Sequence, residues 1–323
     1  MKTIGFFIRH FGERGTEVAV YDYADCNETL LSNNSIIFHF PEHVYRQYNL
    51  PFLEESFNKF KSRFTMVEVN TFSEVNTISE KYQLSYLYMQ TTGGPEHPLF
   101  LTPITATKYF IHCVFTTEQK FGDVYSPISE YINRKCNTSY PVLPYMVRVG
   151  NTDENLREKL QISMDAIVFG RYGGYNEFDI PYVKEAVVEV ARANSNIYFM
   201  FMNTEPFCEL SNVIFLPRNI DLIEKRKFIN TCDAFLHGRE GGETFGLAVA
   251  EFAICKKPII TTKGIYDNAH LDILGNDAIM YYNKVSLMDI LKTFTVNQID
   301  MSLNGYFKYT PENVMAIFSS LIM

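Results

Sequence analysis

The sequence lacks several features that would assign the protein to a large functional class. No apolar run reaches the roughly 18 residues that a membrane-spanning helix needs. The apolar core of the opening segment MKTIGFFIRHFG ends at Arg9 and is too short for a secretory signal. The six cysteines are scattered, with no C-x-x-C pair, and no D-x-D occurs. We therefore expect reduced thiols, no bound metal and a cytoplasmic protein without a transmembrane segment.

Excess positive charge is also missing. The formal net charge is −8 and the isoelectric point lies near 5.5, which argues against a nucleic-acid-binding protein. Tryptophan is absent, although 27 Phe and 21 Tyr supply aromatic surface. A hydrophobic content of 46% and a length of 323 residues suffice for two domains with cores of their own.

One stretch, residues 234–262, organises the rest of the chain. A short apolar run, Ala234 to Leu236, ends a predicted strand, and a glycine-rich loop covers 237–242. A predicted helix follows at 247–255, and a β-branched strand at 258–262. This strand–loop–helix–strand order is the building block of a doubly wound parallel sheet.

The joint between loop and helix has the composition of a phosphate site. A helix N-terminus leaves backbone amides unpaired and carries partial positive charge, so the turn 244–247 can hold a phosphate. Gly246 lets a ligand approach the backbone closely. Glu243 precedes this turn and Glu251 interrupts the apolar helix, and carboxylates at these places can accept hydrogen bonds from sugar hydroxyls.

The pair Glu243 and Glu251, with Phe-Gly-Leu between them, resembles the E-x7-E motif of glycosyltransferase family 4. The resemblance is clearest over residues 165–285 and weaker over 1–150. It implies an α/β protein of the GT-B fold, in which two Rossmann-like doubly wound domains face each other across a cleft. The alternative is an ordinary strand–loop–helix unit that carries two surface glutamates.

The resemblance also implies roles for individual residues. Glu243 contacts the transferred sugar, Glu251 holds the ribose hydroxyls, and the amides of the turn hold the diphosphate together with Arg171. The expected catalytic residues are Glu243, His112 and Arg171. The expected donor-binding residues are Gly12, Arg171, Arg239, Thr244, Phe245, Gly246, Leu247 and Glu251. Family 4 enzymes work without a metal or another cofactor, so neither is expected.

The second predicted domain departs from the family pattern at one cation. The strand 165–171 ends in Gly-Arg, as the family does, and Arg171 matches. The family carries a lysine about five residues further on, and that position falls on Asn176. Because cations stabilise a leaving diphosphate, another basic residue must replace the lysine or catalysis is impaired. Arg239 is the nearest candidate in the motif loop.

The first predicted domain contains two weaker signals. The loop from Gly12 to Gly15 resembles the N-terminal glycine loop of GT-B enzymes, with Thr16 as the expected N-cap of the next helix. His112 interrupts the buried strand 108–115. The resemblance implies that it contacts the donor sugar, and the alternative is a hydrogen-bonded core histidine.

The predicted domains are 1–150 on the acceptor side, 151–305 on the donor side, and a helix in 306–323 that returns to the first domain. That helix follows Thr310 as N-cap and Pro311 at its first position. The implied function is a retaining, hexosyltransferase-type enzyme that moves a sugar from a nucleoside-diphosphate sugar to a hydroxyl of a glycan or glycoconjugate. The alternatives are a catalytically impaired nucleotide-sugar-binding scaffold, or another GT-B class such as an epimerase or phosphorylase.

Overall fold

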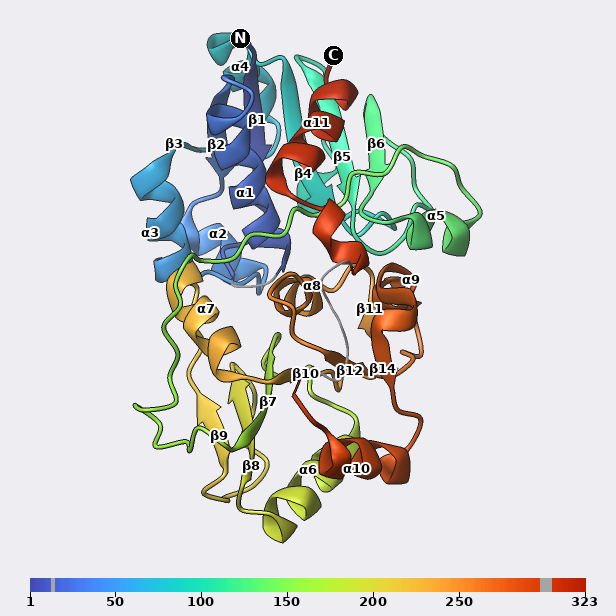
Figure 1. Cartoon of the computed structure of the whole chain (residues 1–323). Coiled ribbons are helices and arrows are strands. Elements are labelled where there is room, and N and C mark those ends of the chain that lie inside the picture. The colour runs from blue at the N-terminus through green and yellow to red at the C-terminus, as the bar shows by residue number, and fades with distance from the viewer. Residues whose placement is uncertain (13–14, 297–303) are drawn as a thin grey trace. The chain divides into compact units, whose positions relative to one another are not determined.

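The computed structural model describes residues 1–12, 15–296 and 304–323 (Figure 1). The chain divides into two compact units. Unit 1 comprises residues 1–146 and 309–323, and unit 2 comprises residues 147–308. Two Rossmann-like doubly wound α/β units were predicted from the sequence, and this fold class is confirmed.

Unit 1 is built on a six-stranded parallel sheet with the order β3-β2-β1-β4-β5-β6. The order reverses between β1 and β4, which is the switch point where open α/β sheets bind ligands beyond the carboxyl ends of their strands. The strands are β1 (Thr3–Phe7), β2 (Asn34–His39), β3 (Thr65–Glu68), β4 (Tyr86–Thr91), β5 (Lys108–Cys113) and β6 (Val124–Pro127).

Helices cover this sheet on both sides, and the one that closes the chain is among them. Figure 1 shows α11 (Pro311–Leu321) beside α1 (Gly15–Thr29), and the two helices are in contact. Phe318 of α11 is fully buried and stacks on Phe110, with ring centroids 5.6 Å apart. The other helices of unit 1 are α2 (Glu42–Gln47), α3 (Glu54–Arg63), α4 (Glu74–Tyr82), α5 (Glu130–Cys136) and the short η1 (Pro98–Phe100).

Unit 2 repeats the same strand order. Its sheet runs β14-β12-β10-β7-β8-β9, so the first and fourth strands in sequence, β7 and β10, are neighbours at the switch point. The strands are β7 (Ile167–Tyr172), β8 (Ile197–Met202), β9 (Val213–Leu216), β10 (Ala234–Leu236), β12 (Ile259–Thr261) and β14 (Ala278–Met280). A separate two-stranded ladder pairs β11 (Gly242–Glu243) with β13 (Asp267–Asn268).

The two faces of this sheet are packed by different helices. Phe169 of β7 lies in the core shared with α6 (Pro181–Ala193) and α10 (Lys284–Thr293). The next residue, Gly170, points to the opposite face, where a side chain would collide with Cys232. That face is covered by α7 (Leu222–Thr231) and α8 (Leu247–Ile254). The remaining helices are α9 (Ala269–Leu274), η2 (Gly275–Asp277) and η3 (Gly305–Lys308).

The structure corrects one predicted helix start. The helix expected from Glu17 begins at Gly15 among the described residues, so Thr16 lies inside α1 and is not its N-cap. Thr16 Oγ1 instead donates a hydrogen bond to the Glu17 carboxylate. Residues 13 and 14 of the predicted glycine loop lie outside the described residues. In the described part of the chain, no helix combines the length and the apolar character that crossing a membrane requires.

Candidate functional site

The predicted motif of unit 2 folds into a tight loop between β10 and α8. Gly242 in this loop has φ +74°, and a side chain there would overlap the backbone carbonyl of Asp267. Gly246 is the N-cap of α8 with φ +82°, a conformation that glycine adopts without strain. The backbone of the loop therefore packs directly against β13 at Gly242. The loop ends at the N-terminus of α8, a helix of eight residues.

Glu243 is held by two partners at the start of this turn. His237 Nε2 lies 3.3 Å from Glu243 Oε1, and Arg239 Nη1 donates to Oε2 at 3.0 Å. Burial alone would raise the pKa of Glu243, but the hydrogen bond from His237 and the charge of Arg239 outweigh it and lower this pKa to about 2. Glu243 is therefore a carboxylate at neutral pH, able to accept hydrogen bonds from hydroxyls.

A buried relay of side chains stands behind Glu243. Thr261 Oγ1 lies 3.1 Å from His237 Nδ1 and 3.1 Å from His270 Nε2. Burial and the neighbouring His237 lower the pKa of His270 to about 3, so His270 is neutral. The hydroxyl of Thr261 can donate to one histidine and accept from the other, so these contacts connect both rings to Glu243. The relay fixes the orientation of Glu243.

Arg171 lies at the carboxyl end of β7, where the sequence predicted a cation. It is 4% exposed, and its Nη1 donates to Thr204 Oγ1 at 2.7 Å. Burial, only partly offset by the charges of Glu177 and Glu243, lowers its pKa to about 10, so the guanidinium stays charged at neutral pH. Arg171 thus brings a buried positive charge to the switch point of unit 2.

The position where the family carries a lysine is occupied by Asn176, which is exposed. Arg239, the predicted substitute, is engaged by two carboxylates. It pairs with Glu243 and, through Nη2, with Glu177 Oε1 at 3.3 Å. Arg239 therefore carries a positive charge at the motif, but that charge is balanced by acidic neighbours.

Glu251 faces the interior of unit 2. It is 2% exposed, its carboxylate lies 2.7 Å from Lys225 Nζ of α7, and it accepts a hydrogen bond from the Tyr172 hydroxyl. These contacts have the geometry of a buried ion pair. Both carboxylate oxygens have a partner inside unit 2, and the predicted contact with a ribose stays a prediction.

The rest of the turn is well packed. Thr244 and Phe245 are buried, and the carbonyl of Phe245 accepts a hydrogen bond from the Tyr306 hydroxyl at 2.6 Å. Leu247, half-buried, opens α8. The first turn of any α-helix has amides without intrahelical partners, so this end of α8 offers donors to an anion.

His112 is placed in the core of unit 1. It is fully buried, its Nδ1 lies 2.6 Å from the Tyr88 hydroxyl, and its Nε2 lies 2.7 Å from the carbonyl of Leu143. Burial lowers its pKa to about 3, so the ring is neutral. Both ring nitrogens are used within unit 1, as in the alternative of a hydrogen-bonded core histidine, and the sugar contact stays a prediction.

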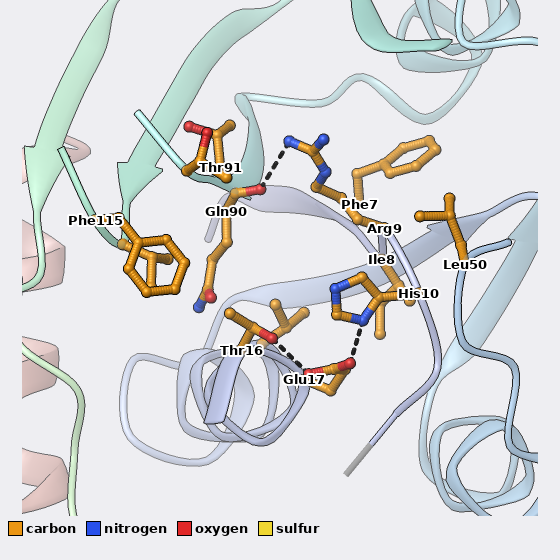
Figure 2. A pocket seen from close by; sticks show the side chains of 13 residues that line it. Phe7, Ile8, Arg9, His10, Thr16, Glu17, Leu50, Gln90, Thr91 and Phe115 are labelled. Carbon is orange, nitrogen blue, oxygen red and sulfur yellow. Dashed lines mark hydrogen bonds and ion pairs between the residues drawn. The ribbon is translucent and has the colours of Figure 1, made fainter. Parts of the chain in front are cut away.

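Gly12, the remaining predicted donor residue, lies beside a pocket of unit 1. A side chain at Gly12 would meet the Glu17 carboxylate, which would have to shift to make room. Glu17 in turn pairs with His10, and Figure 2 shows both residues in the wall of the pocket. The structure thus brings Glu243, Arg171 and Arg239 together in unit 2, whereas His112 and Gly12 belong to unit 1.

Sequence reasoning missed the residues that orient the carboxylates, namely His237, Thr261, His270, Lys225 and Tyr172. His237 and Thr261 are 24 positions apart, and Lys225 and Glu251 are 26 apart, so no local pattern links them. The polar residues His237 and Thr261, each at the end of an apolar strand, were the available signal. Within the described residues, no group of three or more His, Cys, Asp and Glu could hold a metal ion.

Solved structures of other proteins share this architecture. A glycosyltransferase from Rickettsia africae ESF-5 superimposes with a TM-score of 0.68 at 13% identity, covering 99% of this chain and 95% of that one. Anabaena Alr3699/HepE in complex with UDP and glucose gives 0.67 at 11% identity, covering 99% and 98%. The chain has the GT-B fold.

A third GT-B structure, WaaG, a glycosyltransferase involved in lipopolysaccharide biosynthesis, gives a TM-score of 0.64 at 10% identity and covers 98% of both chains. No protein-family model matches the sequence, and no curated protein sequence matches it. At such low identity the likeness establishes the GT-B fold, and the chemistry has to be argued from the residues of this chain.

Proposed function

We propose that the protein is a retaining glycosyltransferase that moves a hexose from a nucleoside-diphosphate sugar to a hydroxyl of a glycan or glycoconjugate. The observation that carries this proposal is the arrangement at the switch point of unit 2. There an ionised carboxylate, Glu243, directly precedes the N-terminus of α8, and the buried cation Arg171 ends the first strand. Anabaena HepE, a structure of the same fold, has been crystallised with UDP and glucose.

The donor diphosphate would be held by the first turn of α8 and by Arg171. The amides of Phe245, Gly246 and Leu247 would donate to phosphate oxygens, and the charge of Arg171 would stabilise the negative charge that grows as the glycosidic bond breaks. A helix terminus and an arginine can do this without a divalent cation, so we propose a metal-independent reaction that needs no further cofactor.

Glu243 would act on the transferred sugar. A carboxylate with a pKa of about 2 cannot donate a proton at neutral pH, so it serves as a hydrogen-bond acceptor and as a negative charge beside the sugar. Positive charge develops at the anomeric carbon in the transition state of glycosyl transfer, and Glu243 would stabilise it. In a front-face reaction with retention, the leaving diphosphate itself accepts the proton of the acceptor hydroxyl.

Glu251 would accept hydrogen bonds from the ribose of the donor, oriented for this by Lys225 and Tyr172. We also propose that His112 contacts the donor sugar, for which one ring nitrogen would have to exchange its present partner, the Tyr88 hydroxyl or the Leu143 carbonyl. A cytoplasmic location also remains part of the proposal, and cell fractionation tests it.

A second candidate is a nucleotide-sugar-binding scaffold that has lost catalysis. The exposed Asn176 at the expected lysine and the balanced charge of Arg239 favour it, because both weaken stabilisation of the leaving group. The two candidates agree on binding and differ in turnover.

One experiment tests both candidates. The purified protein is screened by thermal shift against UDP-, GDP-, ADP- and dTDP-sugars, because a ligand that binds the native state raises the melting temperature. The sugars that bind are then incubated with the protein, and release of nucleoside diphosphate is followed. Release that stops in Arg171→Leu supports the enzyme, binding without release supports the scaffold, and absence of binding refutes both.

A further inference from the structure

A pocket of about 240 Å³ lies in unit 1 where its sheet reverses strand order (Figure 2). Its walls come from the ends of β1 and β4, from the start of α1 and from the segment after β5. This is the location where open α/β sheets bind ligands. The pocket is smaller than the roughly 300–1,000 Å³ of sites for drug-sized molecules, so it suits a single ring.

The arginine that lines this pocket, Arg9, already has an acidic partner. Arg9 Nη2 lies 2.6 Å from Glu96 Oε1 and Nη1 lies 2.9 Å from Oε2, a two-pronged pair. The guanidinium also lies over the ring of Phe100 at 4.1 Å. Because Arg9 is fully engaged and Glu17 adds a buried carboxylate, the pocket offers no surplus cation to an anionic ligand.

Its polar end is a fixed pair of side chains. Glu17 is 4% exposed and contacts Nδ1 of His10. This contact occupies Nδ1 and leaves Nε2 as the ring nitrogen that can hydrogen-bond a ligand. Figure 2 shows this second nitrogen turned toward the interior of the pocket, on the side of Gln90 and Phe115.

Its rim and remaining walls are largely apolar. Phe115 is 43% exposed and lines the pocket, as do Ile8, Val20 and Val114. An exposed aromatic ring beside an imidazole nitrogen fits a ligand with a C–H-bearing face and hydroxyl groups. A neutral sugar or cyclic polyol has both.

We propose that this pocket binds a neutral sugar or cyclic polyol, with Nε2 of His10, oriented by Glu17, forming a hydrogen bond with one ligand hydroxyl and Phe115 packing on the ring. That this ligand is the acceptor of glycosyl transfer rests on the proposed function. The binding itself does not depend on it.

The test measures binding to the full chain by saturation-transfer NMR. The probes are the methyl pyranosides of glucose, galactose, mannose and N-acetylglucosamine, myo-inositol, and glucose 6-phosphate as the anionic comparator. In His10→Asn the amide nitrogen keeps the contact with Glu17 while the second ring nitrogen, Nε2, is lost. Phe115→Ala removes an exposed ring, so it leaves the fold intact. His43→Asn, on the exposed face of α2, is the matched control.

We expect at least one neutral probe to bind, and His10→Asn and Phe115→Ala each to weaken it about tenfold, with His43→Asn unchanged. No binding of any neutral probe, equal binding by all variants, or preference for glucose 6-phosphate overturns the proposal. Binding of UDP-, GDP-, ADP- and dTDP-sugars to the same variants is measured by thermal shift. Sugar binding without any nucleotide binding refutes the proposed function but not the pocket, and nucleotide binding without sugar binding does the opposite.

Discussion

Units 1 and 2 share one sheet topology and use its switch point differently. In both units the candidate residues follow the first and fourth strands in sequence, β1 and β4 in unit 1, β7 and β10 in unit 2. Unit 2 gathers ionised groups there, with Arg171, Arg239 and Glu243 around one helix N-terminus. In unit 1 the charged side chains at this point are paired with each other, and the remaining wall of the pocket is largely apolar. We therefore expect the topology to set where a ligand would bind, and the side chains to set whether that ligand is charged.

The largest effect is expected when the buried ion pair of unit 2 is broken. Lys225→Met leaves Glu251 buried without its cation, which we expect to cost about 3 kcal/mol in the free energy of unfolding. The double variant Lys225→Met/Glu251→Gln removes both charges and is expected to recover most of that loss. Denaturant unfolding measures both, and a double variant as unstable as the single one would contradict the pairing.

The next effect concerns turnover. Glu243→Gln keeps the shape of the side chain and removes its charge, so we expect nucleoside-diphosphate release to fall by about 100- to 1,000-fold. Donor affinity should change little. Glu240→Gln, an exposed residue of the same loop, serves as control in the same kinetic assay. Wild-type turnover in Glu243→Gln would remove Glu243 from the mechanism.

A related effect is the acid sensitivity of unit 2. The folded pKa of Glu243, about 2, lies below its ordinary value of 4.5. Its stabilising contribution, on the order of 3 kcal/mol, is therefore complete above pH 4.5 and is lost as pH falls toward 2. The difference in unfolding free energy between wild type and Glu243→Gln should shrink between pH 5 and pH 3. A constant difference would show that the relay does not hold the charge.

Glycines at the two switch points can be compared directly. A side chain at Gly242 would meet a backbone carbonyl and carry a positive φ, whereas one at Gly12 would meet the movable carboxylate of Glu17. Gly242→Ala should therefore destabilise by about 2 kcal/mol, and Gly12→Ala by less. Thermal unfolding ranks them. Gly12→Ala should weaken binding of the neutral sugar in unit 1, which Gly242→Ala should leave unchanged.

The smallest effect is a gain. Asn176→Lys restores the cation of the family pattern at an exposed position, so we expect nucleoside-diphosphate affinity to rise about two- to fivefold, since exposed charges contribute at most about 1 kcal/mol. Calorimetric titration with UDP measures it. Asn194→Lys, just after α6, adds the same charge elsewhere. An equal rise in both variants would indicate a general effect of net charge.

Much of the architecture could be predicted because its signals are local. The strands around 167–171, 197–202 and 259–261 are apolar runs bounded by polar residues. Thr310 followed by Pro311 correctly predicted the start of α11, and Thr310 accepts a hydrogen bond from the amide of Asn313. The identity of the side-chain partners could not be predicted. Thr261 meets His237 only because β12 pairs with β10, and a lone histidine such as His112 carries no local sign of which atoms satisfy it.

The return of α11 to unit 1 has a consequence for how the protein is made. Residues 309–323 leave the ribosome after all of unit 2, which is continuous in sequence and can fold while synthesis proceeds. Until then, the patch that Phe318 covers, formed by Phe6, Tyr23, Tyr88 and Phe110, stays open. We therefore expect nascent chains to expose this aromatic surface while unit 2 is translated, and termination before residue 311 to leave it uncovered.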